Sequence, residues 1–76
     1  MSDKQIWQTI ALDLKRGANY SASGSKNKAD YYLAEAKSFY EKQKKNEAIN
    51  KIEGFIKFEG DPEDILLGGS LILNRI

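Results

Sequence analysis

The sequence predicts an all-α protein, a small bundle of four short helices in a single domain that covers residues 1–76. Apolar residues recur at helical spacing in three separate stretches. A fourth stretch opens with Asp-Pro-Glu-Asp at 61–64. Asp61 can cap a helix, Pro62 suits the first helical position, and the two acidic residues that follow favour a helix N-terminus. The short connections between the stretches indicate mostly antiparallel neighbours.

The first helix is expected over residues 3–16, with Tyr20 as its furthest end. Ser2 and Gln5 have the spacing of a capping box at its start. Gly17 is expected to end it, because glycine is common just after the last helical residue. Its apolar face consists of Ile6, Trp7, Ile10, Ala11, Leu14 and Ala18, and its polar face includes Asp13, Lys15 and Arg16.

Residues 21–27 are small and polar and predict a flexible surface loop, which is too short to separate two domains. Asn27 is a suitable cap for the second helix. Lysines at the far end of this helix suit the negative pole of the helix dipole, and Asn46 ends it or caps the next helix. The apolar stripe of the second helix is Ala29, Tyr32, Leu33, Ala36, Phe39 and Tyr40.

The third helix is expected over residues 47–58 and is closed by Gly60. Gly54 lies inside it, at a cost of about 1 kcal/mol relative to alanine. Its inward face is predicted to be Ala48, Ile49, Ile52, Phe55 and Ile56.

Residues 65–74 contain apolar groups nearly all round the predicted fourth helix. A surface helix needs only one apolar stripe, so this segment must be covered by its own domain, by a partner chain or by both. The alternative is an α+β fold in which Gly68 and Gly69 form the turn of a C-terminal hairpin. The helix is preferred because leucine favours helices and because a lone two-stranded hairpin is only marginally stable in water.

Composition excludes several classes of function. The 76 residues include no cysteine and no histidine, so disulfides and thiolate or imidazole metal sites are absent, and oligomerisation is the stabilising device that remains for so small a domain. No nucleophile elbow or phosphate-binding loop is present, and we therefore expect no enzyme, no catalytic residue, no metal and no cofactor. The longest uncharged apolar run is about half of the ~20 residues that a membrane span needs, so we expect no membrane contact and a cytoplasmic protein.

These observations predict a small protein-interaction module, acting as an adaptor, inhibitor or assembly subunit. Its partner would be another protein or its own copy in a homo-oligomer. Charge supplies orientation, because residues 1–45 contain nine Lys/Arg and five Asp/Glu, whereas residues 46–76 contain three and six. The double glycine permits close approach of another backbone, either from the same chain or from a partner. The predicted interface is Phe58, Leu66, Leu67, Gly68, Gly69, Leu73 and Ile76.

The alternative function is that of a helical subunit in a nucleoprotein complex. A lysine-rich face would then contact the phosphate backbone, and tyrosines beside it would stack on bases. Acidic residues lie between these lysines in sequence and weaken such a face. The residues concerned are Lys26, Lys28, Lys37, Lys42, Lys44 and Lys45.

Overall fold

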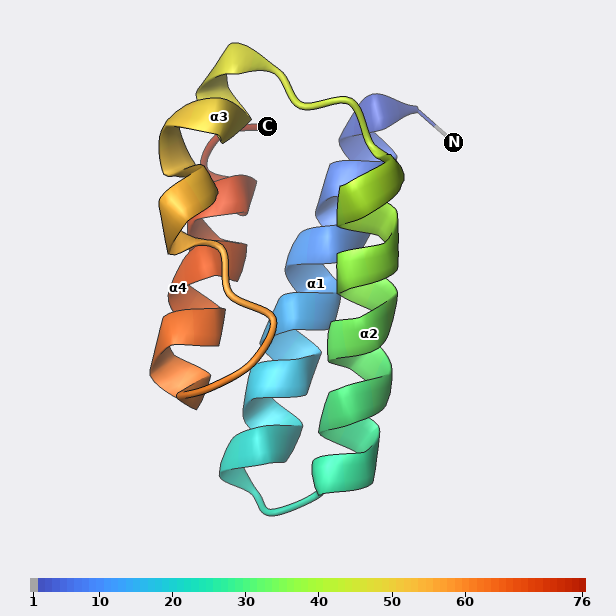
Figure 1. The fold of residues 1–76 in the computed structure, drawn as a ribbon, viewed down its shortest axis with the longest axis vertical. Coiled ribbons are helices and arrows are strands. Elements are labelled where there is room, and N and C mark those ends of the chain that lie inside the picture. Colours follow the sequence, from blue (N-terminus) through green and yellow to red (C-terminus); the bar gives the residue numbers. More distant parts are fainter. Residues whose placement is uncertain (1) are drawn as a thin grey trace.

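The computed structural model describes residues 2–76, and within this range it contains four α-helices, one short 3-10 helix and no strand. The prediction of an all-α bundle is confirmed. The alternative hairpin is not supported, because residues 65–73 lie within the last helix. The elements are α1 (Asp3–Ala22), α2 (Lys26–Lys42), α3 (Glu47–Ile52), the 3-10 helix η1 (Glu53–Phe55) and α4 (Pro62–Leu73) (Figure 1).

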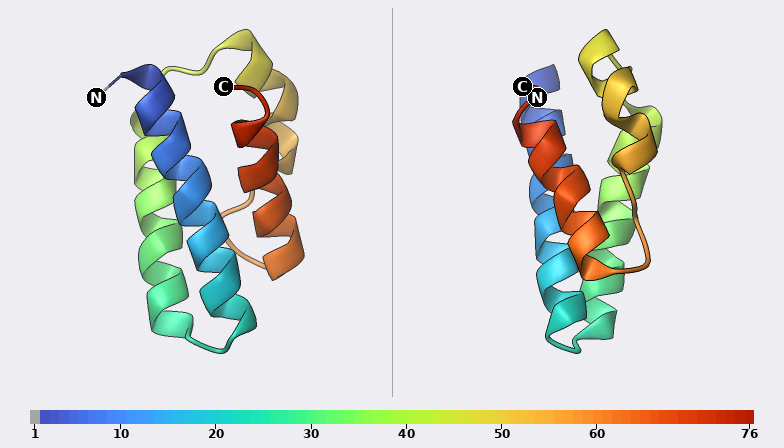
Figure 2. Two further views of the ribbon diagram at one scale, coloured as in Figure 1. Left: turned by 180° about the vertical axis from the view of Figure 1, so that it is seen from behind. Right: turned by 90° about the vertical axis from the view of Figure 1, so that its left-hand side faces the viewer.

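The central element is α1. Helix α2 packs antiparallel to it on one side and α4 packs antiparallel to it on the other, while α3 and η1 lie against α4 (Figures 1 and 2). α1 can pack against two helices because it carries small residues on two of its sides. Gly17 lies against α2, and Ala11 lies against α4. All four α-helices contribute to one core, whose larger members are Trp7, Ile10, Leu14, Leu33, Tyr40, Ile49, Ile52, Ile56, Ile65 and Ile72.

Three of the four α-helix starts follow the capping signals in the sequence. The exception is α2, which begins at Lys26, before the predicted cap Asn27, and whose N-cap residue Ser25 makes no side-chain hydrogen bond. The Oγ of Ser2 accepts a hydrogen bond from the Gln5 backbone N–H at 3.2 Å, and the Ser2 N–H donates to the Gln5 side chain at 2.9 Å, which completes the capping box. At α3, the Oδ1 of Asn46 accepts a hydrogen bond from the backbone N–H of Ile49 at 2.8 Å. At α4, Asp61 accepts from the backbone N–H of Glu63 at 3.0 Å, and the proline follows at the first helical position. Each side-chain cap of this kind contributes about 1 kcal/mol.

Helix α1 does not end at Gly17, as the sequence predicted, but continues to Ala22. Gly17 is buried against α2, and a Cβ at this position would lie 2.5 Å from Cδ2 of Leu33. Packing of the leucine against bare backbone offsets the low helix propensity of glycine. The connection to α2 is therefore only residues 23–25, in place of the predicted loop at 21–27, and it turns at Gly24, whose φ of 87° favours glycine.

The third predicted helix is shorter than expected. α3 and η1 end at Phe55, and residues 56–60 form an irregular connection that carries Phe58. The helix breaks down around Gly54, where no atom would lie within 4 Å of an added Cβ. No packing contact therefore offsets the cost of this glycine, in contrast to Gly17.

Candidate functional site

The double glycine of α4 is buried inside the chain. A Cβ on Gly69 would lie 3.0 Å from the backbone oxygen of Ala11, and one on Gly68 would lie 3.1 Å from the backbone oxygen of Phe55. α4 therefore approaches α1 on one side and the segment around η1 on the other. This close approach explains why two residues of low helix propensity occupy the middle of α4.

The remaining predicted interface residues on or after α4 differ in exposure. Leu66 and Leu73 share the side of Gly69, at helical spacings of three and four. Leu73 and Ile76 are half-buried and pack against the core. Leu66 is 38% exposed, and Leu67, which lies on a different side of the helix, is 48% exposed.

α4 and the elements that pack against it carry most of the exposed large apolar side chains of residues 2–76. Leu12 of α1 is 44% exposed and Phe55 of η1 is 56% exposed, and both elements pack against α4. We call these two side chains, together with Leu66 and Leu67 of α4, the α4 surface. Among residues 2–76, Tyr31 of α2 is the one other large apolar side chain with comparable exposure.

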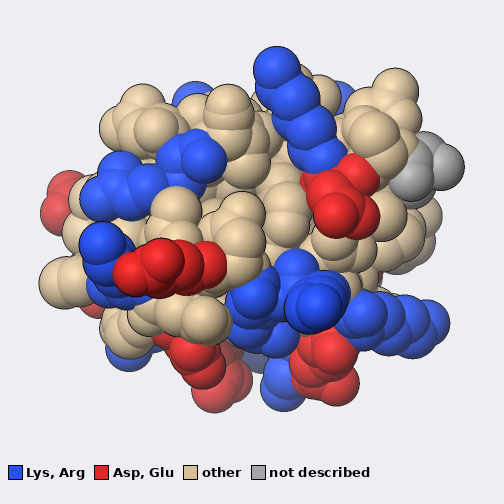
Figure 3. Space-filling model, turned by 90° about the horizontal axis from the view of Figure 1, so that it is seen from above, with Lys and Arg blue, Asp and Glu red and all other residues tan. Residues whose placement is uncertain are grey.

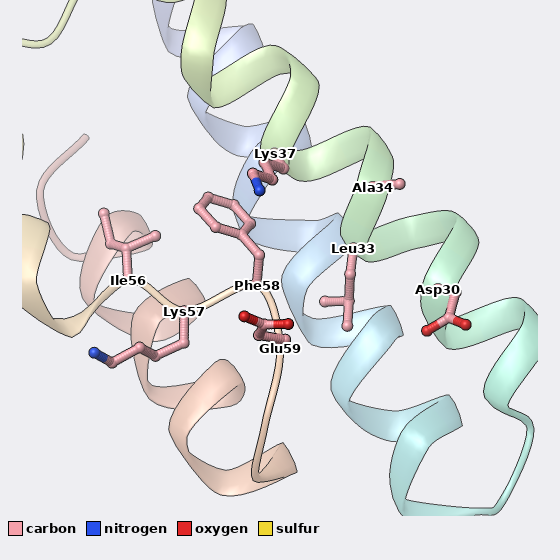
Figure 4. A pocket seen from close by; sticks show the side chains of 8 residues that line it. All are labelled: Asp30, Leu33, Ala34, Lys37, Ile56, Lys57, Phe58 and Glu59. Carbon is pink, nitrogen blue, oxygen red and sulfur yellow. The ribbon is translucent and has the colours of Figure 1, made fainter.

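Phe58 lies in a groove between α2 and the connection that precedes α4 (Figure 4). Its ring is half-buried, with its centroid 5.3 Å from that of Tyr40. The groove has a volume of about 440 Å³, and because side chains of both charges line it, it favours neither an anionic nor a cationic ligand. Its lining residues are Asp30, Leu33, Ala34 and Lys37 of α2, and Ile56, Lys57, Phe58 and Glu59 of the connection.

The lysines of the nucleic-acid alternative are spread along α2 and the turn after it. Lys26 and Lys42 are the first and last residues of a 17-residue helix, and are about 24 Å apart at 1.5 Å per residue. The Nζ of Lys45 donates a hydrogen bond to the backbone oxygen of Tyr40 at 3.1 Å and lies 4.2 Å from the centroid of the Tyr40 ring. Lys45 therefore caps the C-terminal end of α2. Figure 3, a view onto this end of the molecule, shows acidic side chains between the basic ones. The nucleic-acid function stays a prediction for Lys26, Lys28, Lys37, Lys42, Lys44 and Lys45.

The sequence does not predict the burial of Asp13. Its pattern places this residue on the polar face of the first helix, but in the structure Asp13 is only 1% exposed. Its Oδ1 lies 3.9 Å from Nη1 of Arg16, and its Oδ2 has no hydrogen-bond donor among the described residues. Burial raises the pKa of Asp13 to about 7, assisted by a hydrogen bond to Glu35 and by the negative charge of that residue, and opposed by Arg16. Near neutral pH this carboxyl group therefore holds a proton for part of the time.

Three tyrosines form an aromatic cluster that connects α1 to α2. The rings of Tyr20 and Tyr32 stack with their centroids 5.6 Å apart, and Tyr31 meets Tyr32 edge-on at 5.2 Å. The guanidinium of Arg16 lies 5.8 Å from the Tyr32 ring centroid. The pKa of Tyr31 is raised, mainly by the negative charge of Glu35 and to a smaller degree by a hydrogen bond to Glu35. Asp13 itself is covered by these helices and is out of reach of a substrate.

Comparisons with protein-family models, with curated proteins and with solved structures found no match for this chain. In the described part of the chain, no three Asp, Glu, His or Cys side chains come together as a metal site would require. No helix between residues 2 and 76 is long and apolar enough to cross a bilayer. Function must therefore be inferred from the side chains and their surroundings.

Proposed function

We propose that the protein is a small non-enzymatic interaction module, an adaptor, inhibitor or assembly subunit, that binds a second copy of itself or another protein through the α4 surface. The observation that carries this proposal is the exposure of Leu66 and Leu67 on α4 and of Leu12 and Phe55 on elements that pack against it. Exposed large apolar side chains of this kind are typical of protein–protein interfaces, where they form the water-excluding centre. In this proposal, α4 uses Gly68 and Gly69 for internal packing and Leu66 and Leu67 for the external contact.

The size of this surface favours a weak, reversible association. Full burial of one large apolar side chain stabilises a complex by about 1.5–3 kcal/mol, and the four side chains of the α4 surface are already about half covered. Association costs at least about 4 kcal/mol in lost motion. Two copies together bring eight half-covered side chains, a gain of about 6–12 kcal/mol, so at most about 8 kcal/mol remains after this cost, and we expect dissociation constants in the micromolar range or weaker.

Charge supports an antiparallel arrangement of two copies. Asp61, Glu63 and Asp64 lie at the start of α4, whereas Lys4 and Arg75 lie near the opposite end of the molecule, where both termini are found (Figure 2). Two copies that place their α4 surfaces together in opposite directions bring the acidic end of each to the basic end of the other. Such complementarity fixes orientation and favours encounter.

Self-association is tested directly by light scattering over a concentration series from low micromolar to near-millimolar. We expect the apparent mass of the wild-type protein to rise from the 8.6 kDa of one chain towards twice that value. The double variant Leu66→Gln, Leu67→Gln removes apolar area from the α4 surface and is expected to stay at the mass of one chain. Far-UV circular dichroism on the same samples checks that helix content is retained.

The matched control is Ser38→Gln, which places the same side chain at an exposed position of α2 outside the Phe58 groove. It should associate like the wild type. Equal association of the wild type and the double variant would show that another surface is used. A wild-type mass of one chain at every concentration would exclude the second copy as the partner.

A further inference from the structure

The groove that holds Phe58 is longer than the cavity around its ring. A second cavity, of about 430 Å³, lies between the first half of α2 and the connection before α4. The two cavities share four lining residues, so they form one groove along α2, and we use the name Phe58 groove for both together. An elongated occupant fits a groove of this shape better than a compact one does. The shared residues are Asp30, Leu33, Phe58 and Glu59.

The floor of the Phe58 groove is apolar. Leu33 and Ile65 are buried members of the hydrophobic core, and the half-buried ring of Phe58 packs against that core. An apolar side chain that enters the groove therefore meets a surface that is already in place, and it loses contact with water when it does so. The floor thus supplies a contact for one apolar group of the occupant.

The charged side chains of the Phe58 groove follow a fixed order along α2. Asp30 of α2 and Glu59 of the connection line both cavities, from opposite walls (Figure 4). Lys37 and Lys57 line only the first cavity, which is the one nearer η1. Among residues 2–76, the one ion pair joins Arg16 to Asp13, so no charge of the groove is paired within the chain. Two carboxylates therefore border the same space with no cation of the chain between them.

The connection also offers backbone hydrogen-bonding groups to an occupant. No backbone–backbone hydrogen bond within residues 2–76 involves residues 58–60, and these residues lie outside the helices. Glu59 and Gly60 are exposed, so their backbone groups are hydrated in the free protein. A peptide backbone in the groove can replace this water, as bound peptides do when they pair with free backbone groups.

We propose that the Phe58 groove binds an extended peptide segment of another protein, in which a basic and an acidic residue flank an apolar one. The basic side chain lies between Asp30 and Glu59, the apolar side chain lies on Leu33, and the acidic side chain faces Lys37. A small ion would match only one end of this lining, whereas a peptide matches both. The site is separate from the α4 surface, so this inference does not depend on the function proposed above.

The geometry of α2 sets the spacing of the peptide. Asp30 and Lys37 are seven residues apart on one helix, which is about 10 Å along its axis. An extended chain rises about 3.3 Å per residue and points every second side chain to the same face. A basic, an apolar and an acidic residue at alternate positions therefore span about 13 Å, and flexible charged side chains accommodate the difference.

Binding is tested with the isotope-labelled full chain and the synthetic peptide acetyl-Gly-Arg-Ser-Leu-Ser-Glu-Gly-amide. Amide chemical shifts in an NMR titration should change saturably for residues 26–37 and 56–60, with a dissociation constant of about 0.1–1 mM. Two control peptides carry arginine at both charged positions or glutamate at both. Each control peptide should bind at least about threefold more weakly, because one of its charges meets a like charge in the groove.

A charge reversal in the protein separates recognition from a loss of structure. The double variant Asp30→Lys, Glu59→Lys should bind the Arg-Ser-Leu-Ser-Glu peptide about tenfold more weakly, and the peptide with two glutamates more tightly than the wild type does. A distorted groove would weaken both. Glu41→Lys makes the same change of charge at an exposed position of α2 outside the groove and should bind like the wild type. The Leu66→Gln, Leu67→Gln variant should also bind like the wild type.

Four results would each overturn the proposal. These are no shift change at millimolar Arg-Ser-Leu-Ser-Glu peptide, equal binding of the three peptides, equal loss of all binding in the charge-reversed variant, and shift changes centred on the α4 surface. A dependence of the signals of residues 26–37 and 56–60 on protein concentration alone would also contradict it. In that case the occupant of the groove would be a second copy of the chain.

Discussion

Replacing Gly69 with leucine is expected to lower the free energy of unfolding by about 3 kcal/mol or more, because a side chain here must enter a closely packed interface. Even the first carbon would lie 3.0 Å from the backbone oxygen of Ala11 and 3.4 Å from Cβ of Leu14. The backbone oxygen of Ala11 cannot move aside as the end of a flexible side chain can, so α4 must move away from α1 to make room. Thermal unfolding followed by circular dichroism should show a melting temperature lower by about 12 °C or more.

Gly54→Leu is the matched control for this substitution. No atom lies within 4 Å of an added Cβ at Gly54, and its φ is outside the region that favours glycine. We expect a change in unfolding free energy within about 0.5 kcal/mol, as for most surface substitutions. A Gly69→Leu protein that keeps the wild-type melting temperature but no longer self-associates would instead place Gly69 in an interface between chains.

Replacing Trp7 with alanine is expected to cost about 3–5 kcal/mol. Trp7 is 2% exposed and packs edge-on against Tyr40, so its removal leaves a cavity where α1 meets α2. A domain of 76 residues has a total stability of roughly 4–11 kcal/mol, so the substitution removes between about a quarter and all of that stability. Urea unfolding followed by far-UV circular dichroism measures this directly, without relying on tryptophan fluorescence.

Leu67→Ala provides the comparison for the Trp7 variant, since both remove apolar atoms but Leu67 is 48% exposed. At concentrations where the protein is a single chain, its effect should be below about 1 kcal/mol. A Leu67→Ala variant as unstable as Trp7→Ala would mean that the α4 surface supports the fold and is not kept for a partner.

Periodicity and capping residues were enough to predict four helices. The start of α1 at Ser2 and the start of α4 at Asp61 were both predicted, because caps depend on a few adjacent residues. The stripe on α2 was predicted for the same local reason, and its members Ala29, Leu33 and Ala36 are buried.

The effect of each glycine on its helix was predicted less well, because it depends on residues that are far away in sequence. Gly17 and Gly54 have the same intrinsic helix propensity, but Leu33 packs on the first and nothing packs near the second. The first helix therefore continues through its glycine, whereas the third stops beside its own. For Gly68 and Gly69 the sequence required a close neighbour but left open whether that neighbour belonged to the same chain.

The burial of Asp13 was out of reach of sequence reasoning. Asp13 stands between Leu12 and Leu14 in the printed sequence and is followed by Lys15 and Arg16, so it was grouped with these polar residues. Whether it is covered depends on where α2 packs on α1, and the contact of Leu33 with Gly17 becomes visible only in the structure. A buried acid next to an apolar face was the one available signal, and it required knowledge of the interface.

The central place of α1 has a consequence for synthesis. The ribosome releases α1 and α2 first, and they have a mutual interface that can form at once. α4 is made after both, so until it is made the flank of α1 at Ala11 and Leu14 has no cover. During synthesis the chain therefore passes through a stage in which a two-helix hairpin exposes apolar groups, and such surfaces are prone to aggregation.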